Sequence, residues 1–220
     1  MRPAGPMVEV TGLFVYPVKS MRGIELDAAR LTPTGLEHDR RFMVVRENGE
    51  FVTQRNLPLL TLIETSIEPG GIVLSREGCG RIFVPFDADG GATLKTRVWK
   101  DECLATDQGE TISRWLTEAL ESTDRLLLVA MQSGFERPQG KADVLGADTR
   151  TLFADAAPFL VANEASLSQL NRELAERGQQ ALPMNRFRPN IVVQGLDAFA
   201  EHRLGGLAGG DYQLCLLYTS

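Results

Sequence analysis

The sequence has little cysteine and histidine, and no paired cysteine motif. Its 220 residues contain three cysteines, Cys79, Cys103 and Cys215, and two histidines, His38 and His202, all far apart in the chain. An odd number of scattered cysteines does not form a disulfide framework, and without a CxxC pair it does not match a typical zinc site. The sequence therefore predicts no metal site built from these residues and a reducing compartment, and we expect a cytoplasmic protein.

Positive charge and long apolar runs are also scarce. Lysine and arginine together number 23 against 29 aspartate and glutamate residues, a formal net charge of −6. General binders of nucleic acid or anionic membranes need an excess of cations. No apolar run reaches the roughly 18 residues of a membrane span, and the N-terminus lacks the apolar core of a signal peptide. We therefore expect neither nucleic acid nor membrane among the partners.

Common catalytic motifs are missing as well. The sequence has no GxSxG, no P-loop and no GxGxxG with an acidic residue at the required distance. These absences exclude the nucleophile-elbow hydrolases, the P-loop NTPases and the dinucleotide-binding Rossmann enzymes. No catalytic residue can be named from such a motif.

Short strands fill the first hundred residues. Segments rich in β-branched and aromatic residues alternate with turn signals, which is typical of a small barrel or sandwich. Of the two we predict the barrel, closed or nearly closed. Asn48-Gly49 is a hairpin signal, because both residues tolerate the positive φ of a tight turn. The predicted strands are residues 8–16, 41–46, 51–54, 60–67, 72–75, 81–85 and 94–99.

The rest of the chain mixes helices and strands. Apolar residues at helical spacing predict a helix over 112–120, with Asp107 and Glu110 as a capping box. A second helix is expected to begin at the cap Asn163 and end at Gly178. Further predicted elements are strands at 126–131, 159–162 and 191–193 and a long loop over 132–149. The sequence predicts a mixed β/α, mostly β fold, with domains over residues 1–124 and 125–220.

Two loop segments in the first domain place cations before or after a strand. Tyr16 to Ser20 runs from a strand into a proline turn that presents Lys19 beside a hydroxyl, a combination suited to phosphate or another oxyanion. His38 to Arg41 precedes the next strand and carries Arg40. Each segment is also compatible with plain solvated charges.

A third cationic segment precedes the strand at 191–193. Arg186 and Arg188 stand two residues apart and would point the same way on an extended backbone, which Pro189 favours for Arg188. Such a fork suits phosphate or carboxylate. The helix start at 163–166 offers amides to an anion too, although ordinary capping explains it better.

Taken in order, these motifs resemble those of MOSC-domain proteins with an N-terminal β-barrel domain. That family includes the amidoxime-reducing components, hydroxylaminopurine-detoxifying proteins and the C-terminal domain of molybdenum-cofactor sulfurases. The matching pieces are Tyr16-Pro17-Val18-Lys19-Ser20, Arg22-Gly23, Gly35-Leu36, Asp39-Arg40, Val98-Trp99-Lys100-Asp101, Pro158-Phe159-Leu160, Glu164-Ala165-Ser166-Leu167, Phe187-Arg188-Pro189-Asn190 and Gly210-Asp211.

The resemblance implies a molybdenum–molybdopterin cofactor held between the two domains. Lys19, Ser20, Arg40 and Arg188 match family positions that contact the pterin phosphate and ring, and Asn190 in the same motif is assigned to cofactor binding with them. The anion-binding chemistry of these loops agrees with that assignment. The family also carries the label of pyridoxal phosphate binding.

The implied activity is the two-electron reduction of a small N-hydroxylated compound. Because the chain has no ferredoxin-like cysteine run, the electrons would come from a separate electron-transfer protein. The alternative is a non-catalytic carrier that binds the molybdenum cofactor or a sulfur species. A plain β-rich interaction module is the third interpretation, and it would leave the cationic residues dispersed.

The sequence departs from the family pattern in two places. Ala156 and Ala157 stand where the family has small hydroxyl residues, so only backbone donors remain there. The family cysteine that ligates molybdenum would lie beyond Ser220, and Cys215 is out of register with it. We therefore expect an incomplete MOSC domain with no assignable metal ligand, and a chain that as written is catalytically incompetent.

Overall fold

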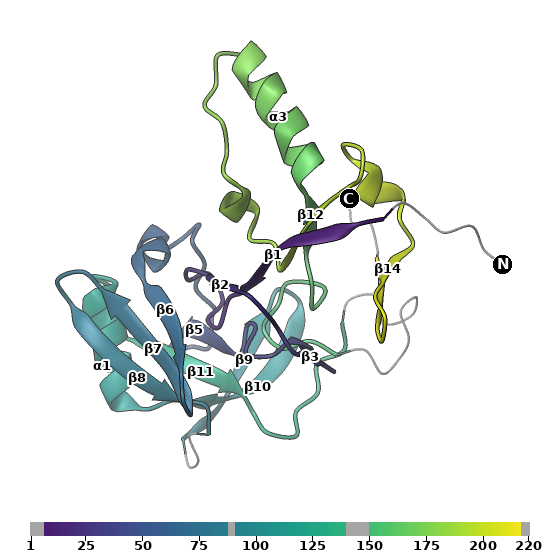
Figure 1. The fold of residues 1–220 in the computed structure, drawn as a ribbon. Helices are drawn as coiled ribbons and strands as arrows, with labels where there is room; N and C mark the ends of the chain where they lie inside the picture. The colour runs from purple at the N-terminus through teal and green to yellow at the C-terminus, as the bar shows by residue number, and fades with distance from the viewer. Residues whose placement is uncertain (1–6, 88–90, 140–149, 217–220) are drawn as a thin grey trace. The chain divides into compact units, whose positions relative to one another are not determined.

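The structure, a computed structural model, describes residues 7–87, 91–139 and 150–216 (Figure 1). Its chain divides into two compact units whose segments alternate along the sequence. The large unit comprises Val15–Ile24 and Arg30–Pro158; the small unit comprises Met1–Phe14, Glu25–Ala29 and Phe159–Ser220. These units are defined by packing, and the predicted domain boundary after residue 124 stays a prediction.

Two antiparallel sheets form most of the large unit in the residues that the structure describes. One has the strand order β5-β11-β10-β9 and the other β6-β7-β8, and β3 and β4 form a short separate pair. The elements are β3 (Leu31–Thr32), β4 (Gly35–Leu36), β5 (Phe42–Arg46), the 3-10 helix η1 (Pro58–Leu62), β6 (Glu64–Glu68), β7 (Gly71–Arg76), β8 (Gly80–Pro85), β9 (Thr93–Val98), β10 (Asp101–Asp107), α1 (Glu110–Ala119) and β11 (Leu126–Met131).

Both sheets and helix α1 contribute side chains to one apolar core. Phe42 and Leu128 from the first sheet, Leu74 from the second and Leu116 from α1 are completely buried in it. Burial of apolar side chains from both sheets in one cluster stabilises the large unit, at about 1.5–3 kcal/mol for each large residue. The predicted mostly β, barrel-like fold is confirmed.

Helix α1 keeps the predicted apolar stripe but not the predicted capping box. Its N-cap is Gly109, and the Asp107 carboxylate accepts a hydrogen bond from the Gly109 N–H at 3.1 Å. Glu110 instead forms an ion pair with Arg125 at 2.5 Å. The capping prediction is wrong because Asp107 is the last residue of β10, and its own N–H donates to Ala92 O.

The strand predictions hold for most segments and fail for two, and the longest strand that was not predicted is β10. The first half of 60–67 is the 3-10 helix η1, whose first residue Pro58 has no N–H for a ladder. In 51–54, Phe51 alone forms a bridge, to Val45. Strand β10 was not predicted, because its buried side chains are the small Cys103 and Ala105, a weak hydrophobic signal. Residues 140–149 of the predicted loop lie outside the described residues.

A four-stranded sheet with the order β12-β13-β1-β2 forms the centre of the small unit. Strands β12 and β13 are parallel and are joined by a segment that includes helix α3, whereas β1 and β13 are antiparallel. The elements are β1 (Glu9–Val15), β2 (Ile24–Leu26), β12 (Val161–Asn163), α3 (Glu164–Glu176), the 3-10 helices η2 (Met184–Phe187) and η3 (Ala200–Arg203), β13 (Ile191–Gln194), β14 (Gly206–Ala208) and β15 (Gln213–Cys215).

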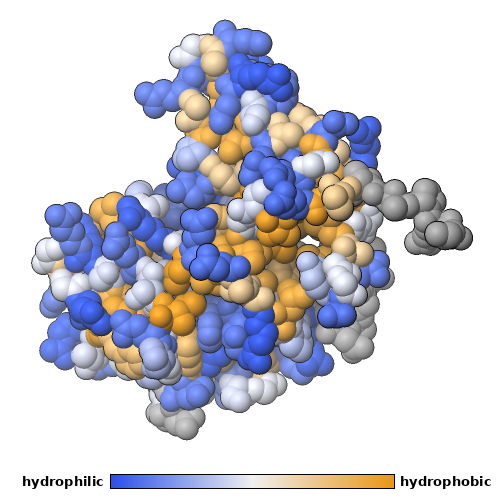
Figure 2. All heavy atoms as spheres, in the orientation of Figure 1, coloured by the Kyte–Doolittle hydropathy of each residue, from blue (hydrophilic) through white to orange (hydrophobic). Residues whose placement is uncertain are grey.

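Helix α3 begins as predicted at the cap Asn163, whose side-chain oxygen accepts from the Ala165 N–H at 3.1 Å. Polar residues cover much of the visible surface around α3, with apolar ones between them (Figure 2). Among the described residues, no helix is both long and apolar enough to cross a membrane.

The tight turn at Gly49 gives a stability prediction. Gly49 and Gly78 have nearly the same φ, 81° and 79°, so alanine at either position carries the left-handed strain of about 1–2 kcal/mol. An added Cβ at Gly49 would also overlap the carbonyl oxygen of Lys95, whereas at Gly78 it would meet no described atom within 4 Å. We expect Gly49→Ala to cost about 1–3 kcal/mol more than Gly78→Ala in urea unfolding. Equal losses would contradict this account of the turn.

Candidate functional site

The Lys19 side chain is buried in the large unit, with only 7% of its surface exposed. Its ammonium donates to the carbonyl oxygen of Phe153 at 3.0 Å and forms an ion pair with Asp155. Burial lowers the pKa of Lys19 from its ordinary value, and the attraction of Asp155 opposes that shift. An ammonium has three N–H donors, and two of them have partners among the described residues.

Arg40 lies close enough to Lys19 for the repulsion between their positive charges to lower the pKa of Lys19. The Arg40 guanidinium stacks over the Tyr16 ring at 4.3 Å and donates to the buried Asp39 carboxylate at 2.5 Å. Asp39 also accepts from the Tyr16 backbone N–H at 2.8 Å, which fixes the chain just before the proline turn. The structure thus brings the predicted residues Lys19 and Arg40 into one neighbourhood of the large unit.

Several predicted site residues have strained backbones. Among the described non-glycine residues, seven have a positive φ, and three of them are predicted site residues: Ser20 (70°), Arg40 (45°) and Arg188 (56°). The other four are His38, Trp99, Glu121 and Phe199. Such conformations cost of order 1–3 kcal/mol each and cluster at functional sites. The Ser20 carbonyl accepts from the Gln54 side chain at 2.7 Å, which stabilises the turn.

Arg137 is a residue that the sequence analysis missed. It is 3% exposed and donates to the Asp101 carboxylate at 2.7 and 3.0 Å. It also donates to the carbonyl oxygens of Leu152, Ala154 and Asp155 at 2.8, 2.6 and 3.0 Å. All five guanidinium N–H groups are therefore used, which fixes the segment that carries Asp155. The only sequence signal was an arginine within a loop of unusual length.

The residues around Lys19 fit a bound oxyanion. A buried ammonium with one N–H lacking a partner among the described residues can donate to a phosphate oxygen without breaking its pair with Asp155. Described residues contain no group of three or more His, Cys, Asp or Glu side chains placed to hold a metal ion. The donor set suits the phosphate-bearing part of a cofactor.

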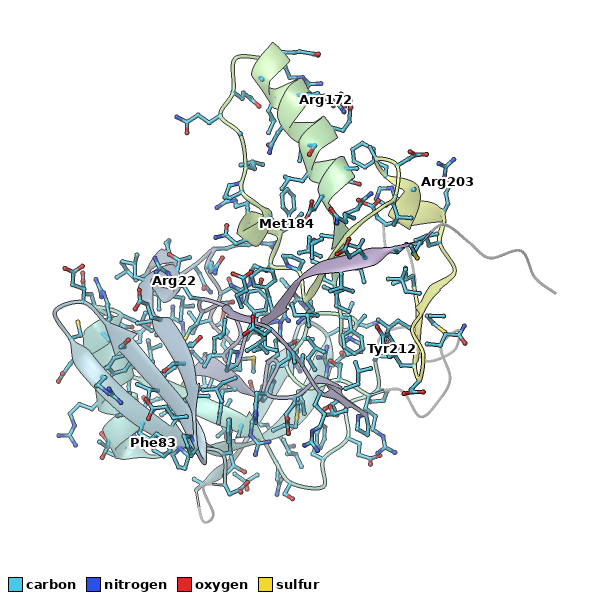
Figure 3. The ribbon with its side chains drawn as sticks, in the orientation of Figure 1. Arg22, Phe83, Arg172, Met184, Arg203 and Tyr212 are labelled. Carbon is cyan, nitrogen blue, oxygen red and sulfur yellow. The ribbon has the colours of Figure 1, made fainter. Side chains whose placement is uncertain are left out.

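The small unit contains the other two predicted residues. Arg188 does not extend into β13 beside Arg186, as expected from the sequence. Residues 184–187 form η2, seen with Met184 in Figure 3, and Arg188 closes that turn in a left-handed conformation, donating its N–H to Asn185 O at 3.1 Å. The expected extended fork is therefore wrong.

Asn190 is buried, and its side chain serves the fold of the small unit. Its Nδ2 donates to Phe14 O at 3.1 Å, and its Oδ1 accepts from the Leu160 N–H at 3.2 Å. These bonds connect β1 with the segment that leads into β12. A cofactor-binding role for Asn190, and the convergence of Arg188 with Lys19, Ser20 and Arg40, stay predictions.

Two family models match the chain. Residues 7–123 match the model of the MOSC N-terminal beta barrel domain, and residues 148–215 match that of the MOSC domain. The chain belongs to the MOSC family.

Curated relatives of this MOSC protein include the human "Mitochondrial amidoxime-reducing component 1". The two are 33% identical over 211 residues, which cover 93% of this chain and 61% of the relative. The Danio rerio protein of that name is 30% identical over 211 residues (93% and 64%), and the Bos taurus "Mitochondrial amidoxime reducing component 2" is 30% identical over 212 residues (93% and 62%). The chain thus spans about three fifths of the length of these relatives.

Arg137 binds Asp101 and the carbonyl oxygens of Leu152, Ala154 and Asp155, and these contacts, here called the Arg137 clamp, give a second stability prediction. Arg137→Gln leaves Asp101 and several carbonyl oxygens without a charged donor, so we expect a loss of about 3–5 kcal/mol in the free energy of unfolding. Arg97→Gln removes an exposed ion pair with Glu102 at 2.8 Å and should cost less than about 1 kcal/mol. Urea unfolding of the two variants measures the difference. A loss at Arg137 no larger than at Arg97 would show that the clamp adds little.

The lowered pKa of Lys19 gives a third prediction. NMR of the Lys19 side chain, assigned with the Lys19→Arg variant, should show titration below the ordinary value of 10.5. In Asp155→Asn the pKa should fall further, because the attraction of that carboxylate is lost. Between the folded pKa and 10.5 the unfolded state binds more protons, so Lys19 adds stability as pH rises in that window. A higher pKa in Asp155→Asn would rule out the pairing described here.

Proposed function

We propose that this MOSC protein binds a molybdenum–molybdopterin cofactor and, in its full-length form, reduces small N-hydroxylated compounds, with electrons from a separate protein. The observation that carries the proposal is the buried Lys19 ammonium, which retains a donor for an anionic ligand within the described structure. Membership of the MOSC family and relatives named amidoxime-reducing components support the reaction class.

In this proposal each residue has a binding role. Lys19 donates to a phosphate oxygen, the Ser20 turn supplies a hydroxyl beside it, and Arg40 contributes a guanidinium held flat by Tyr16. Arg188 of the small unit completes the set, and Asn190 supports its loop. A bound molybdenum centre would supply the two-electron chemistry that side chains cannot.

The strain at Ser20 and Arg40 fits this role. A backbone already held in a left-handed conformation orients its side chain before the ligand binds, and this lowers the entropic cost of binding.

The predicted cytoplasmic location and the family-level label of pyridoxal phosphate binding stay predictions.

The alternative is a carrier that holds the cofactor or a sulfur species without turnover. Both functions predict cofactor retention, but only the reductase predicts product. Protein extended at its C-terminus with a family-like sequence, purified from a host that makes molybdenum cofactor and supplied with an electron donor, should reduce a hydroxylamine or an amidoxime. Retained cofactor without any reduction by a protein extended at its C-terminus with a family-like sequence would favour the carrier.

The two arginines before β13 give the fourth prediction. Arg188→Ala should lower pterin and molybdenum content several-fold, because Arg188 is assigned to the cofactor. Arg186→Ala is the matched control, since it removes an exposed guanidinium two residues earlier in the same turn. Pterin content is measured by fluorescence after oxidation and molybdenum by mass spectrometry. Equal content in the two variants would remove Arg188 from the site.

A further inference from the structure

Gly23 lies against the ring of Tyr16 in the large unit. It belongs to the short motif Arg22-Gly23, which has no part in the proposed function. A Cβ added to Gly23 would lie 2.4 Å from Cε1, 2.8 Å from Cδ1 and 2.9 Å from Cζ of the Tyr16 ring. The φ of Gly23 lies outside the left-handed region, so the backbone conformation does not require glycine. Glycine is needed at this position because the ring approaches the backbone so closely.

The backbone beside Gly23 is held in place. The preceding residue Arg22, labelled in Figure 3, donates its N–H to the Ile63 carbonyl oxygen at 3.3 Å. Its own carbonyl oxygen accepts from the Thr65 hydroxyl at 2.9 Å. A side chain at position 23 would therefore displace the Tyr16 ring more readily than it would displace the backbone.

The Tyr16 ring in turn contacts the guanidinium of Arg40. Tyr16 is only 3% exposed, and the guanidinium carbon lies 4.3 Å from the centre of its ring. The buried Asp39 carboxylate accepts from the Arg40 guanidinium at 2.5 Å and from the Tyr16 backbone N–H at 2.8 Å. An aromatic ring and a carboxylate, themselves joined by a hydrogen bond, thus fix the Arg40 side chain.

Holding Arg40 in this position has an electrostatic cost. Its positive charge repels that of the buried Lys19 and lowers the pKa of Lys19. The Arg40 backbone is already fixed, because its N–H donates to the Tyr16 carbonyl at 2.8 Å and its carbonyl accepts from the Phe153 N–H at 3.0 Å. The ring and the carboxylate therefore act on the side chain and keep it near a second cation. A bound anion would offset the repulsion between the two cations.

We propose that Gly23 is a positioning residue for an anion site formed by Lys19 and Arg40. Gly23 admits the Tyr16 ring, the ring orients the Arg40 guanidinium, and Arg40 and Lys19 together bind the anionic group of the ligand. Gly23 and Tyr16 act only through Arg40. This inference rests on the proposed function and adds to it the residues that set the orientation of Arg40.

NMR of the protein without cofactor tests the orientation of Arg40. The ring current of Tyr16 shifts the Arg40 Nε proton upfield, and Arg40→Lys assigns that signal. We expect the shift to be kept in Tyr16→Phe, lost in Tyr16→Leu and reduced in Gly23→Ala. The matched control is Gly209→Ala, whose added Cβ would lie 2.4 Å from Cε1 of Tyr212 in the small unit. An unchanged Arg40 signal in Gly23→Ala would overturn the role of Gly23.

Calorimetry with inorganic pyrophosphate tests the anion site itself. Tyr16→Leu and Gly23→Ala should each weaken pyrophosphate binding about fivefold, the loss expected when a cation–π contact no longer orients the guanidinium. Tyr16→Phe and Gly209→Ala should bind as the unchanged protein does. Equal affinity in Tyr16→Phe and Tyr16→Leu would overturn the role of the ring, as would an absence of saturable binding to the unchanged protein.

Two double-mutant cycles separate positioning from a general effect on the fold. In an Arg40→Ala background, Tyr16→Leu should cause no further loss of pyrophosphate affinity, because the ring acts through Arg40. In a Tyr16→Leu background, Gly23→Ala should cause no further loss, because the ring that its methyl group would displace is absent. The second cycle applies even where Gly23→Ala alone does not fold. A further loss in either background would overturn the proposal.

Pterin and molybdenum content are measured on the same variants. A protein that binds pyrophosphate as described but retains no pterin would overturn the proposed function and leave the role of Gly23 standing. Retained pterin, together with equal pyrophosphate affinity in all the variants, would overturn the role of Gly23 and leave the proposed function standing.

Discussion

Burial of the Lys19 ammonium is the constraint on which the rest of the site depends. A charge removed from water is costly unless it is paired and hydrogen-bonded. Here the pairing comes from Asp155 and the carbonyl oxygen of Phe153, both in a segment more than 130 residues further along the chain. Because these partners must be in place before Lys19 can be buried, the proline turn and the 152–155 segment are energetically coupled.

The same requirement explains the strained residues nearby. The Phe153 N–H donates to the Arg40 carbonyl at 3.0 Å, and the Arg40 N–H donates to the Tyr16 carbonyl at 2.8 Å. A left-handed backbone at Arg40 therefore belongs to a chain of hydrogen bonds that joins three distant segments. The strain is offset by contacts that satisfy buried polar groups, which makes the arrangement rigid rather than adaptable.

The turns, helix caps and strands that depend on neighbouring residues could be predicted from the sequence. The Asn48-Gly49 turn, the Asn163 cap and strand 126–131 follow from turn residues, capping and apolar runs, and the structure has them. The cationic loops at Lys19 and Arg40 were predicted from residue type and from the resemblance. Gly23 appeared only as part of a matching motif, with no role.

What the sequence could not provide depends on contacts between distant residues. Nothing local indicates that Arg137 binds carbonyl groups 15 to 18 residues away, or that Asp155 pairs with Lys19. A residue that precedes proline normally has an extended backbone, but Arg188 does not, because η2 turns the chain just before Pro189. Ion pairs between residues far apart in the sequence decide between conformations that local propensities favour equally.

The alternation of segments between the two units has a consequence for synthesis on the ribosome. Strand β1 is among the first elements made, yet its antiparallel partner β13 begins at Ile191. The sheets of the large unit can pair once β11 has emerged, while β1 still has no strand beside it on that edge. An unpaired edge is a template for pairing with other chains. The nascent protein therefore passes through a long interval in which one edge of its N-terminal strand has no partner strand.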